Sequence, residues 1–350
     1  MPTNSTTWKK SALFLALLGA APISIAEDVN TKFYGSVRMG VAMVDTGSAT
    51  DVEDGANGRD YLSRVGVKID SVVKDDIKAI AGVEYGLRSD SKTNDYNQNG
   101  SVTLRQIWVG LKGDFGTIKF GSQTNIWHSF VRSAYFSSAG DSLRQGSIRD
   151  DDLLNYVYKS GDFKFGASIQ MENQDGDSID QYQVGGQYKA GPLTMQLAYA
   201  QDNRGDSKGS LTGARVWLKA SDAVTLSAYR HQADEDYDFY TGGSTGNNYV
   251  VNDGVKTSGL QTCKTEERSS TGLYARYRSG ANQFHTRYAV DSCDVKGDVS
   301  SIKVEYVHYL TKKYRMWASY EAFDNDEGRA PKTDTGDNFT EYQVGVRYDF

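Results

Sequence analysis

Short segments in which apolar and polar residues alternate recur along this sequence from Thr31 to its last residue. Successive side chains of a β-strand point to opposite faces, so each segment fits a strand with one apolar and one polar face. The last segment shows the pattern best, because its apolar residues are every second one, namely Tyr342, Val344, Val346, Tyr348 and Phe350. The recurrence predicts an all-β fold.

The connections between these segments alternate between very short turns and longer polar loops. We count sixteen segments, and they begin near residues 33, 64, 77, 104, 117, 153, 163, 182, 193, 211, 224, 272, 283, 301, 314 and 339. The short turns are at residues 74–76, 114–116, 160–162, 190–192, 221–223, 279–281 and 311–313. With an even number of strands, all short turns and both termini are expected on one side.

This sorting of the connections distinguishes two folds that share the alternation. A soluble β-sandwich also has strands with one apolar face, but it has no reason to put its short and long connections on opposite sides. In lipid, backbone groups must pair internally, and closing the sheet removes its unpaired edges. The sequence therefore predicts a transmembrane antiparallel barrel of sixteen strands, apolar outside and polar inside.

The first residues are expected to be a cleaved leader. Lys9 and Lys10 precede an apolar run over residues 11–25, and small residues follow at the positions that a signal peptidase reads. The run is too short for a comfortable transmembrane helix. We predict a signal peptide over residues 1–26, cleavage between Ala26 and Glu27, and one barrel domain over residues 27–350, because no linker interrupts that range.

Composition agrees with this prediction and excludes one class of partner. The chain carries 39 basic and 45 acidic residues, a net charge of −6, so no nucleic-acid partner is expected. It holds 23 tyrosines and 36 glycines, and only Pro192 and Pro331 fall within residues 27–350. Such a chain is rich in strand-forming residues and poor in strand breakers.

Nothing in the sequence indicates catalysis or a metal site. The four histidines, at 128, 231, 285 and 308, belong to no recognisable catalytic motif. Acidic runs such as residues 234–236 offer the oxygen ligands that Ca²⁺ prefers, and could also meet lipopolysaccharide through divalent ions. No complete calcium-loop pattern is present, so solvated loop charge is the preferred interpretation. We expect no enzyme activity, no cofactor and no metal.

The chain has two cysteines, Cys263 and Cys293, which fall on neighbouring long loops. An exported chain enters an oxidising compartment, so a disulfide between them is the favoured interpretation and two free thiols the alternative. Such a bridge would tie the largest loop to the rim of the barrel.

Several motifs, in the right order, resemble one family. Phe33-Tyr34-Gly35, the run at residues 63–68, the run at residues 105–113 and the terminal Tyr348-Asp349-Phe350 are similar to those of the Gram-negative general diffusion porins. The resemblance implies a homotrimer of 16-stranded outer-membrane barrels, each with an inward-folded third loop. Outer-membrane lipid and lipopolysaccharide would surround it, and the barrel assembly machinery would read Phe350 as the assembly signal.

The resemblance also implies a water-filled channel for passive diffusion of small hydrophilic solutes and ions. Its constriction would set basic wall residues against acidic residues of the third loop. This sequence has Ser36 where the family often places lysine, and its third loop lacks the family's Pro-Glu-Phe stretch. The matching positions are Arg38, Arg64, Arg105 and Arg149 on the basic side and Asp141 on the acidic side, with Asp150, Asp151 and Asp152 as further acidic candidates near the end of the loop.

Facing charges across a narrow aqueous gap create a transverse field that filters solutes by size and charge. The alternative is that these arginines are ordinary solvated lumen charges. A second alternative concerns function, because the same barrel can form a substrate-specific channel with a dedicated solute-binding constriction. Tyr229, Tyr274 and Trp317, on inward registers, would be the first candidates for that site.

Overall fold

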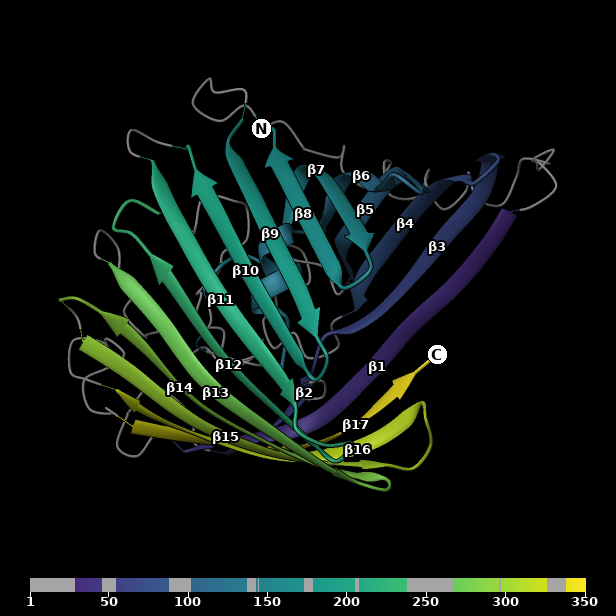
Figure 1. The fold of residues 1–350 in the computed structure, drawn as a ribbon. Helices are drawn as coiled ribbons and strands as arrows, with labels where there is room; N and C mark the ends of the chain where they lie inside the picture. The colour runs from purple at the N-terminus through teal and green to yellow at the C-terminus, as the bar shows by residue number, and fades with distance from the viewer. Residues whose placement is uncertain are drawn as a thin grey trace, which may run out of the picture.

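The fold is known from a computed structural model that describes residues 29–45, 55–87, 102–136, 143, 145–172, 179–204, 208–237, 267–295, 297–325 and 338–350. These residues form one antiparallel sheet that closes on itself (Figure 1). No helix in these ranges has the length and apolar character needed to cross a membrane.

The elements follow one another along the chain as a meander. They are β1 (Val29–Asp45), β2 (Gly55–Asp60), β3 (Ser63–Lys74), β4 (Ile77–Leu87), β5 (Val102–Gly113), β6 (Gly116–Thr124), η1 (His128–Arg132), β7 (Arg149–Ser160), β8 (Phe163–Gln170), β9 (Gln181–Ala190), β10 (Leu193–Asp202), β11 (Gly209–Lys219), β12 (Val224–Ala233), β13 (Arg268–Ser279), β14 (Asn282–Cys293), β15 (Gly297–Tyr309), β16 (Tyr314–Asn325) and β17 (Asn338–Asp349). Each strand from β3 onward pairs with its successor, and β17 pairs with β1.

The wall has sixteen strand positions although seventeen strands are described, because β2 and β3 share one position. The C-terminal part of β1 pairs with β2, where Met39 faces Asp60. The N-terminal part of β1 pairs with β3, where Ser36 faces Arg64. Between them, Leu62 adopts a φ of 68°, and the register shifts by one residue. The predicted count of sixteen is confirmed.

The strand starts predicted near residues 33 and 64 leave residues 55–60 in a long connection, and this is wrong because these residues form β2. The reason is the length of β1, whose 17 residues extend beyond the part that β3 covers. An unpaired strand edge exposes backbone N–H and C=O groups, and β2 satisfies them.

The seven short turns form where predicted, and Gly161 and Gly280, with φ of 55° and 58°, supply the left-handed conformation that two-residue hairpin turns require.

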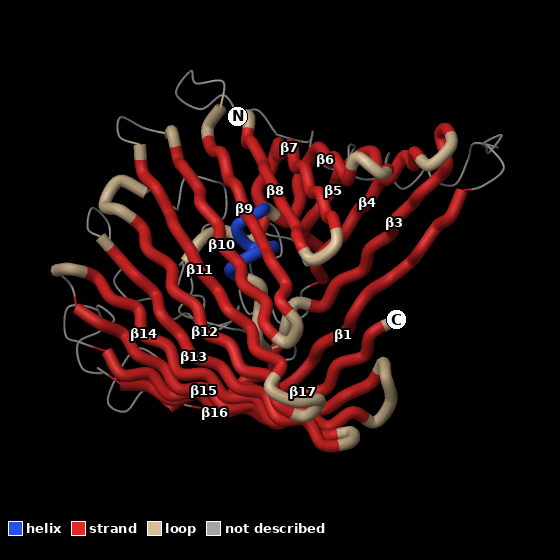
Figure 2. The backbone as a smooth tube through the Cα atoms, in the orientation of Figure 1, coloured by secondary structure: helices blue, strands red, loops and turns tan. Residues whose placement is uncertain are grey.

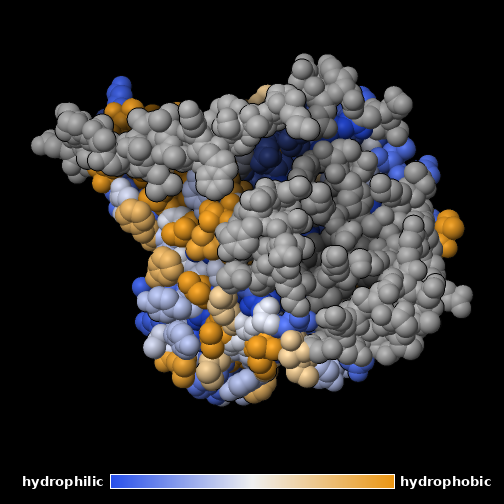
Figure 3. Space-filling view, turned by 180° about the vertical axis from the view of Figure 1, so that it is seen from behind, coloured by the Kyte–Doolittle hydropathy of each residue, from blue (hydrophilic) through white to orange (hydrophobic). Residues whose placement is uncertain are grey.

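The two faces of the wall differ as the alternation predicts. Apolar side chains are exposed on the outer face, and Figure 3 shows them as orange patches on the described surface. Phe33, for example, is 71% exposed and Leu197 64% exposed. The inner face carries polar and charged side chains that are buried from solvent, such as Gln183 and Arg215.

Candidate functional site

Three arginines predicted for the constriction lie close together on the inner wall. Ser36 of β1 faces Arg64 of β3, and the Arg38 Nε atom donates a hydrogen bond to Ser36 Oγ at 2.8 Å. Arg64 lies within electrostatic reach of both Arg38 and Arg105. The structure therefore brings guanidinium groups from β1, β3 and β5 into one cluster, the basic cluster.

A β-bulge aims Arg105 at this cluster. Glu84 of β4 faces Gln106 and Tyr85 faces Leu104, so Arg105 is the extra residue that has no partner in register. Bulges commonly redirect a side chain in this way. The Arg105 Nε atom donates to Glu84 Oε1 at 2.8 Å, and both side chains are largely buried.

Glu84 is a member of the cluster that we did not select from the sequence. Its signal was present, because the alternation in residues 77–87 puts Glu84 on the same face as Gly82 and Gly86. Its carboxylate lies in the field of both Arg64 and Arg105, and Tyr34 hydrogen-bonds to it. Glu84 thus partly neutralises the arginines and holds Arg105 in place.

More cations continue this side of the inner wall. Three lysines lie over aromatic rings: Lys68 over Tyr34 at 4.9 Å, Lys119 over Trp108 at 4.4 Å and Lys164 over Phe130 at 4.6 Å from the ring centroid. Ring faces attract ammonium groups without cancelling their charge. These lysines of β3, β6 and β8 therefore add positive charge to the inner wall beside the basic cluster.

Two cations on another part of the wall share one carboxylate. Glu321 receives hydrogen bonds from Arg287 at 2.7 Å and from Lys303 at 2.8 Å. These three side chains are almost fully buried. Because each cation there has a carboxylate at contact distance, this region contributes less net field than the basic cluster does.

The described residues of the connection between β6 and β7 lie inside the barrel, where Figure 2 shows η1 in blue. Phe130 is fully buried and packs on Gly166 of β8 and Gly185 of β9. A Cβ atom added at Gly185 would lie 2.7 Å from Phe130 Cδ2, so only glycine fits there. Trp127 occupies a similar seat beside Gly213. These glycines let the connection lie directly against the wall.

Hydrogen bonds fix the same segment. The Trp127 backbone N–H donates to Gln183 Oε1 at 2.8 Å, and its indole N–H donates to the Gln145 carbonyl at 2.7 Å. The Arg215 Nη1 atom donates to the Ser133 carbonyl at 2.6 Å. The segment is therefore attached to the wall through backbone and side-chain groups along its length.

The aromatic residues that were candidates for a solute-binding track hold this connection or the wall instead. Tyr274 stacks on Tyr135 with ring centroids 4.3 Å apart, and the Tyr229 hydroxyl donates to the Leu143 carbonyl at 2.7 Å. Trp317 packs edge-on against Tyr61 at 5.2 Å. All three candidates are at most 5% exposed, so their ring faces meet protein and not the aqueous lumen.

The remaining predicted positions are distributed as follows. Arg149 opens β7, two strands further along the wall than Arg105, and faces Thr124. Phe350 pairs with Gly35, its N–H donating to the Gly35 carbonyl at 3.1 Å. Cys293 ends β14 and is disulfide-bonded. The other predicted positions lie outside the described residues: Ala26, Glu27, Asp141 and Cys263. The roles assigned to these positions stay predictions.

The profile of the Gram-negative porins matches residues 12–328. The chain belongs to this family. The porin is 23% identical over 359 residues to the major outer membrane protein P.IB of Neisseria gonorrhoeae, with 97% of this chain and 90% of that protein covered. It is 20% identical over 360 residues to the porin-like protein H of Photobacterium profundum, with 98% and 100% covered.

Solved structures of outer-membrane proteins share the fold. The porin superposes on the anion-selective porin from Comamonas acidovorans with a TM-score of 0.70 and 19% identity, over 92% of this chain and 100% of that one. OmpT of Vibrio cholerae in its trimer form gives a TM-score of 0.64 and 15% identity, over 93% and 100%. The porin is thus an outer-membrane channel for passive diffusion, and family membership indicates a non-enzymatic protein.

Proposed function

We propose that this porin is a passive pore that prefers anions, and that the basic cluster forms one side of its constriction. One observation carries this proposal. Arg38, Arg64 and Arg105 converge on the inner wall, where Glu84 contacts Arg105 at hydrogen-bond distance and Asp349 is a second carboxylate in the field of Arg38 and Arg64. A positive field at the narrowest part of a pore concentrates anions and opposes cations.

The net charge of −6 does not contradict this preference. At physiological ionic strength, charges more than about 8 Å away from a permeating ion are largely screened. Selectivity therefore depends on the charges that line the narrow part of the lumen and much less on charges elsewhere. The fold likeness to a porin that is described as anion-selective is consistent with such a wall.

The opposite side of the constriction remains as the family resemblance implies it. Asp141 is the proposed acidic partner, and Arg149 the proposed fourth cation. The inward position of Trp127 and Phe130 supports this arrangement, because the connection that carries Asp141 enters the barrel at those residues. Facing charges would then orient dipolar solutes as they pass.

The test is a reversal potential in a planar bilayer under a KCl gradient. The double variant Arg64→Gln/Arg105→Gln removes two charges whose potential at about 4 Å in water is worth about 1 kcal/mol each. We expect chloride preference to fall by about fivefold or more. The matched control is Arg278→Gln, a like change at the exposed end of β13 near the short turn. An unchanged reversal potential in the double variant would refute the proposal.

The same recordings separate a general pore from a substrate-specific channel. A general pore gives a current that grows in proportion to salt concentration, whereas a channel with a dedicated solute site saturates and is blocked by one class of solute. The burial of Tyr229, Tyr274 and Trp317 favours the general pore.

We also propose a homotrimer. The described outer wall of β5 is apolar and exposed, with Val102 at 57% and Val109 at 59%, and a neighbouring copy or lipid must cover it. The fold likeness to an outer membrane protein solved in a trimer form supports a neighbouring copy. Channels that close in three equal steps, from an oligomer that dissociates on heating, are the expected result.

A further inference from the structure

Three lysines line the inner face of the wall between the basic cluster and the short turns. Lys68 lies further along β3 than Arg64, on the same face of the strand and closer to the short turn that follows. Lys119 and Lys164 come soon after short turns, near the starts of β6 and β8. Short turns face the periplasm in outer-membrane barrels. These three residues, the lysine row, therefore line the periplasmic half of the lumen.

Glycines seat the Lys119 side chain on the wall. Its ammonium lies 4.4 Å from the centroid of the Trp108 ring. A Cβ atom added at Gly82 would lie 2.5 Å from Trp108 Cζ2, and one added at Gly110 would lie 2.9 Å from Lys119 Cγ. The ring and the lysine stem therefore lie directly against the backbone of the wall. An aromatic ring attracts an ammonium group without cancelling its charge, so Trp108 fixes the position of this cation.

Lys68 is held in the same way on β3. Its ammonium lies 4.9 Å from the centroid of the Tyr34 ring, and a Cβ atom added at Gly66 would lie 2.5 Å from Tyr34 Cζ. The next residue on this face of the strand is Asp70, whose carboxylate accepts a hydrogen bond from Lys78 at 3.2 Å. The carboxylate that is closest to Lys68 along β3 is thus paired with another lysine.

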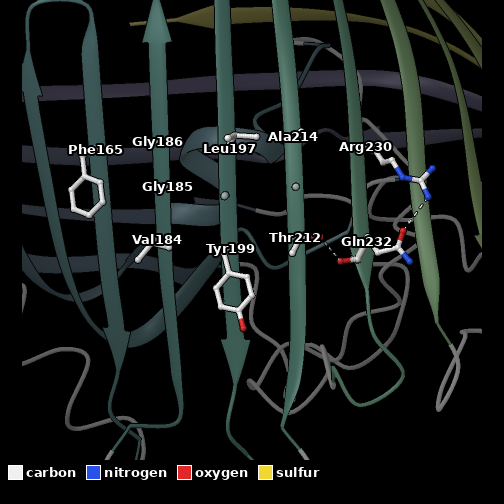
Figure 4. Close-up of a pocket in the computed structure, with 12 residues that line it drawn as sticks. Phe165, Val184, Gly185, Gly186, Leu197, Tyr199, Thr212, Ala214, Arg230 and Gln232 are labelled. Atoms are coloured by element: carbon white, nitrogen blue, oxygen red, sulfur yellow. Dashed lines mark hydrogen bonds between the residues drawn. The ribbon is translucent and has the colours of Figure 1, made fainter.

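The inner connection holds the third member of the lysine row. The Lys164 ammonium lies 4.6 Å from the centroid of the Phe130 ring. Phe130 packs on Gly185 of β9, which Figure 4 labels between Val184 and Gly186. The ring that carries Lys164 is therefore itself fixed against the wall.

The lysine row carries charge that no neighbouring carboxylate neutralises. Among the residues that the structure describes, its three ammonium groups form no ion pair and donate no hydrogen bond. Lys219, at the same end of the barrel, differs because its ammonium pairs with Asp222 at 2.6 Å. Lys68 is exposed, Lys119 and Lys164 are partly exposed, and Lys68 lies within electrostatic reach of Lys119. Unpaired cations so placed attract an anion that has more than one charge.

We propose that the lysine row is a second anion site of this porin, and that it binds small solutes with several phosphate groups. An ammonium group is a compact charge with three donors, so one multivalent anion can contact two of them at once, whereas chloride contacts one. The site deepens the proposed anion preference and rests on it, because an anion that enters from outside must first pass the basic cluster. The basic cluster then selects the sign of the charge, and the lysine row selects its magnitude.

The test variant is Lys68→Met/Lys119→Met. Methionine keeps an unbranched stem that packs well on an aromatic ring, so the wall keeps its packing while two charges are lost. The matched control is Lys219→Met/Lys312→Met, which removes the same charge from exposed positions at the same end of the barrel. Single-channel conductance in about 1 M KCl, where charges are screened beyond about 3 Å, checks that each pore is intact.

The experiment measures how inorganic tripolyphosphate reduces the chloride current in a planar bilayer at about 0.1 M KCl, where the screening length is about 10 Å. Acetate serves as the monovalent control. We expect tripolyphosphate to block the wild type in a saturable manner and acetate not to block it. The half-blocking concentration should rise about tenfold or more in Lys68→Met/Lys119→Met, because two charge-assisted contacts are lost, and stay at the wild-type value in the control pair.

The absence of a saturable block in the wild type, or an unchanged half-blocking concentration in Lys68→Met/Lys119→Met, would overturn the proposal. An equal loss of block in the control pair would do so too, because the block would then depend on total charge alone. The reversal potential of the wild type under a KCl gradient is read in the same bilayer. Potassium preference there would refute the proposed function, whereas chloride preference without the block would refute the lysine row only.

Discussion

The attachment of the inner connection to the wall can be measured by removing its main anchor. Phe130 is fully buried, it contacts Gly166 and Gly185, and the Lys164 ammonium lies over its ring at 4.6 Å. Replacing a buried phenylalanine by alanine costs about 3–5 kcal/mol. The strands of the wall do not depend on this contact, so the loss in Phe130→Ala falls on the equilibrium between the docked and undocked connection.

A cost of about 3 kcal/mol raises the undocked population about 150-fold, since each 1.4 kcal/mol is a factor of ten. Hydrogen exchange reports this population directly, because an amide exchanges when its local structure opens. The Trp127 amide is the best probe, since its N–H donates to Gln183 only when the connection is docked. We expect the peptide over residues 125–136 to exchange about 100-fold faster in Phe130→Ala, with protection of the wall strands unchanged.

Phe165→Ala is the matched control. Phe165 lies on β8 near Gly166 but points outward, where it is 47% exposed. The same atoms are removed there without touching the connection, so exchange of residues 125–136 should stay at the wild-type rate. Equal rates in Phe130→Ala and wild type would refute the reasoning that this ring holds the connection. Single-channel recordings should show added current noise in Phe130→Ala only.

Three further predictions concern positions taken from the sequence. Thiol titration of the denatured, unreduced protein should find no reactive thiol, because we expect Cys263 to bridge Cys293; two thiols would exclude the bridge. Deleting Phe350 should lower the amount of folded protein in the outer membrane at unchanged synthesis, and a wild-type level would remove its role as assembly signal. Sequencing the N-terminus of the exported protein should give Glu27 first, and any other start would correct the cleavage between Ala26 and Glu27.

The strands could be predicted because the residues within each strand alternate between an apolar and a polar face. In a membrane barrel, the alternation seen in residues 163–170 is a local property that lipid and water impose on neighbouring positions. Short turns are equally local. The sixteen strand positions and the seven short turns therefore followed from the sequence without knowledge of any long-range contact.

The parts of the structure that the sequence did not predict depend on contacts between residues far apart in the chain. The strand β2 forms because β1 extends beyond the part that pairs with β3 and needs a partner there. No local pattern in residues 55–60 indicates this strand. The seats for Phe130 and Trp127 require glycines on β8, β9 and β11 to meet a loop between β6 and β7. Single glycines are common in barrel strands, so their pairing with these rings was not visible.

The basic cluster could be predicted from the sequence in part. Arg64 and Arg105 were found through family motifs, whereas Glu84 could have been found from the alternation alone, as the charged inward residue of its strand. The aromatic candidates show the opposite error. An inward register predicted that Tyr229 and Tyr274 would face water, but the connection inside the barrel covers them. Register fixes the face of a strand and not what packs on that face.

The pairing of β17 with β1 makes the order of synthesis matter. The first strand leaves the cell interior early, yet its partner at residues 338–349 is made last, so β1 must wait with one edge unpaired while the intervening strands arrive. A chain that stops before β17 cannot close the sheet. It leaves one edge of β1 and one edge of β16 with unpaired backbone groups that can pair with other chains. Only a molecule that has both β1 and β17 can therefore complete the wall, and a copy that lacks either one keeps unpaired strand edges that a finished barrel does not have.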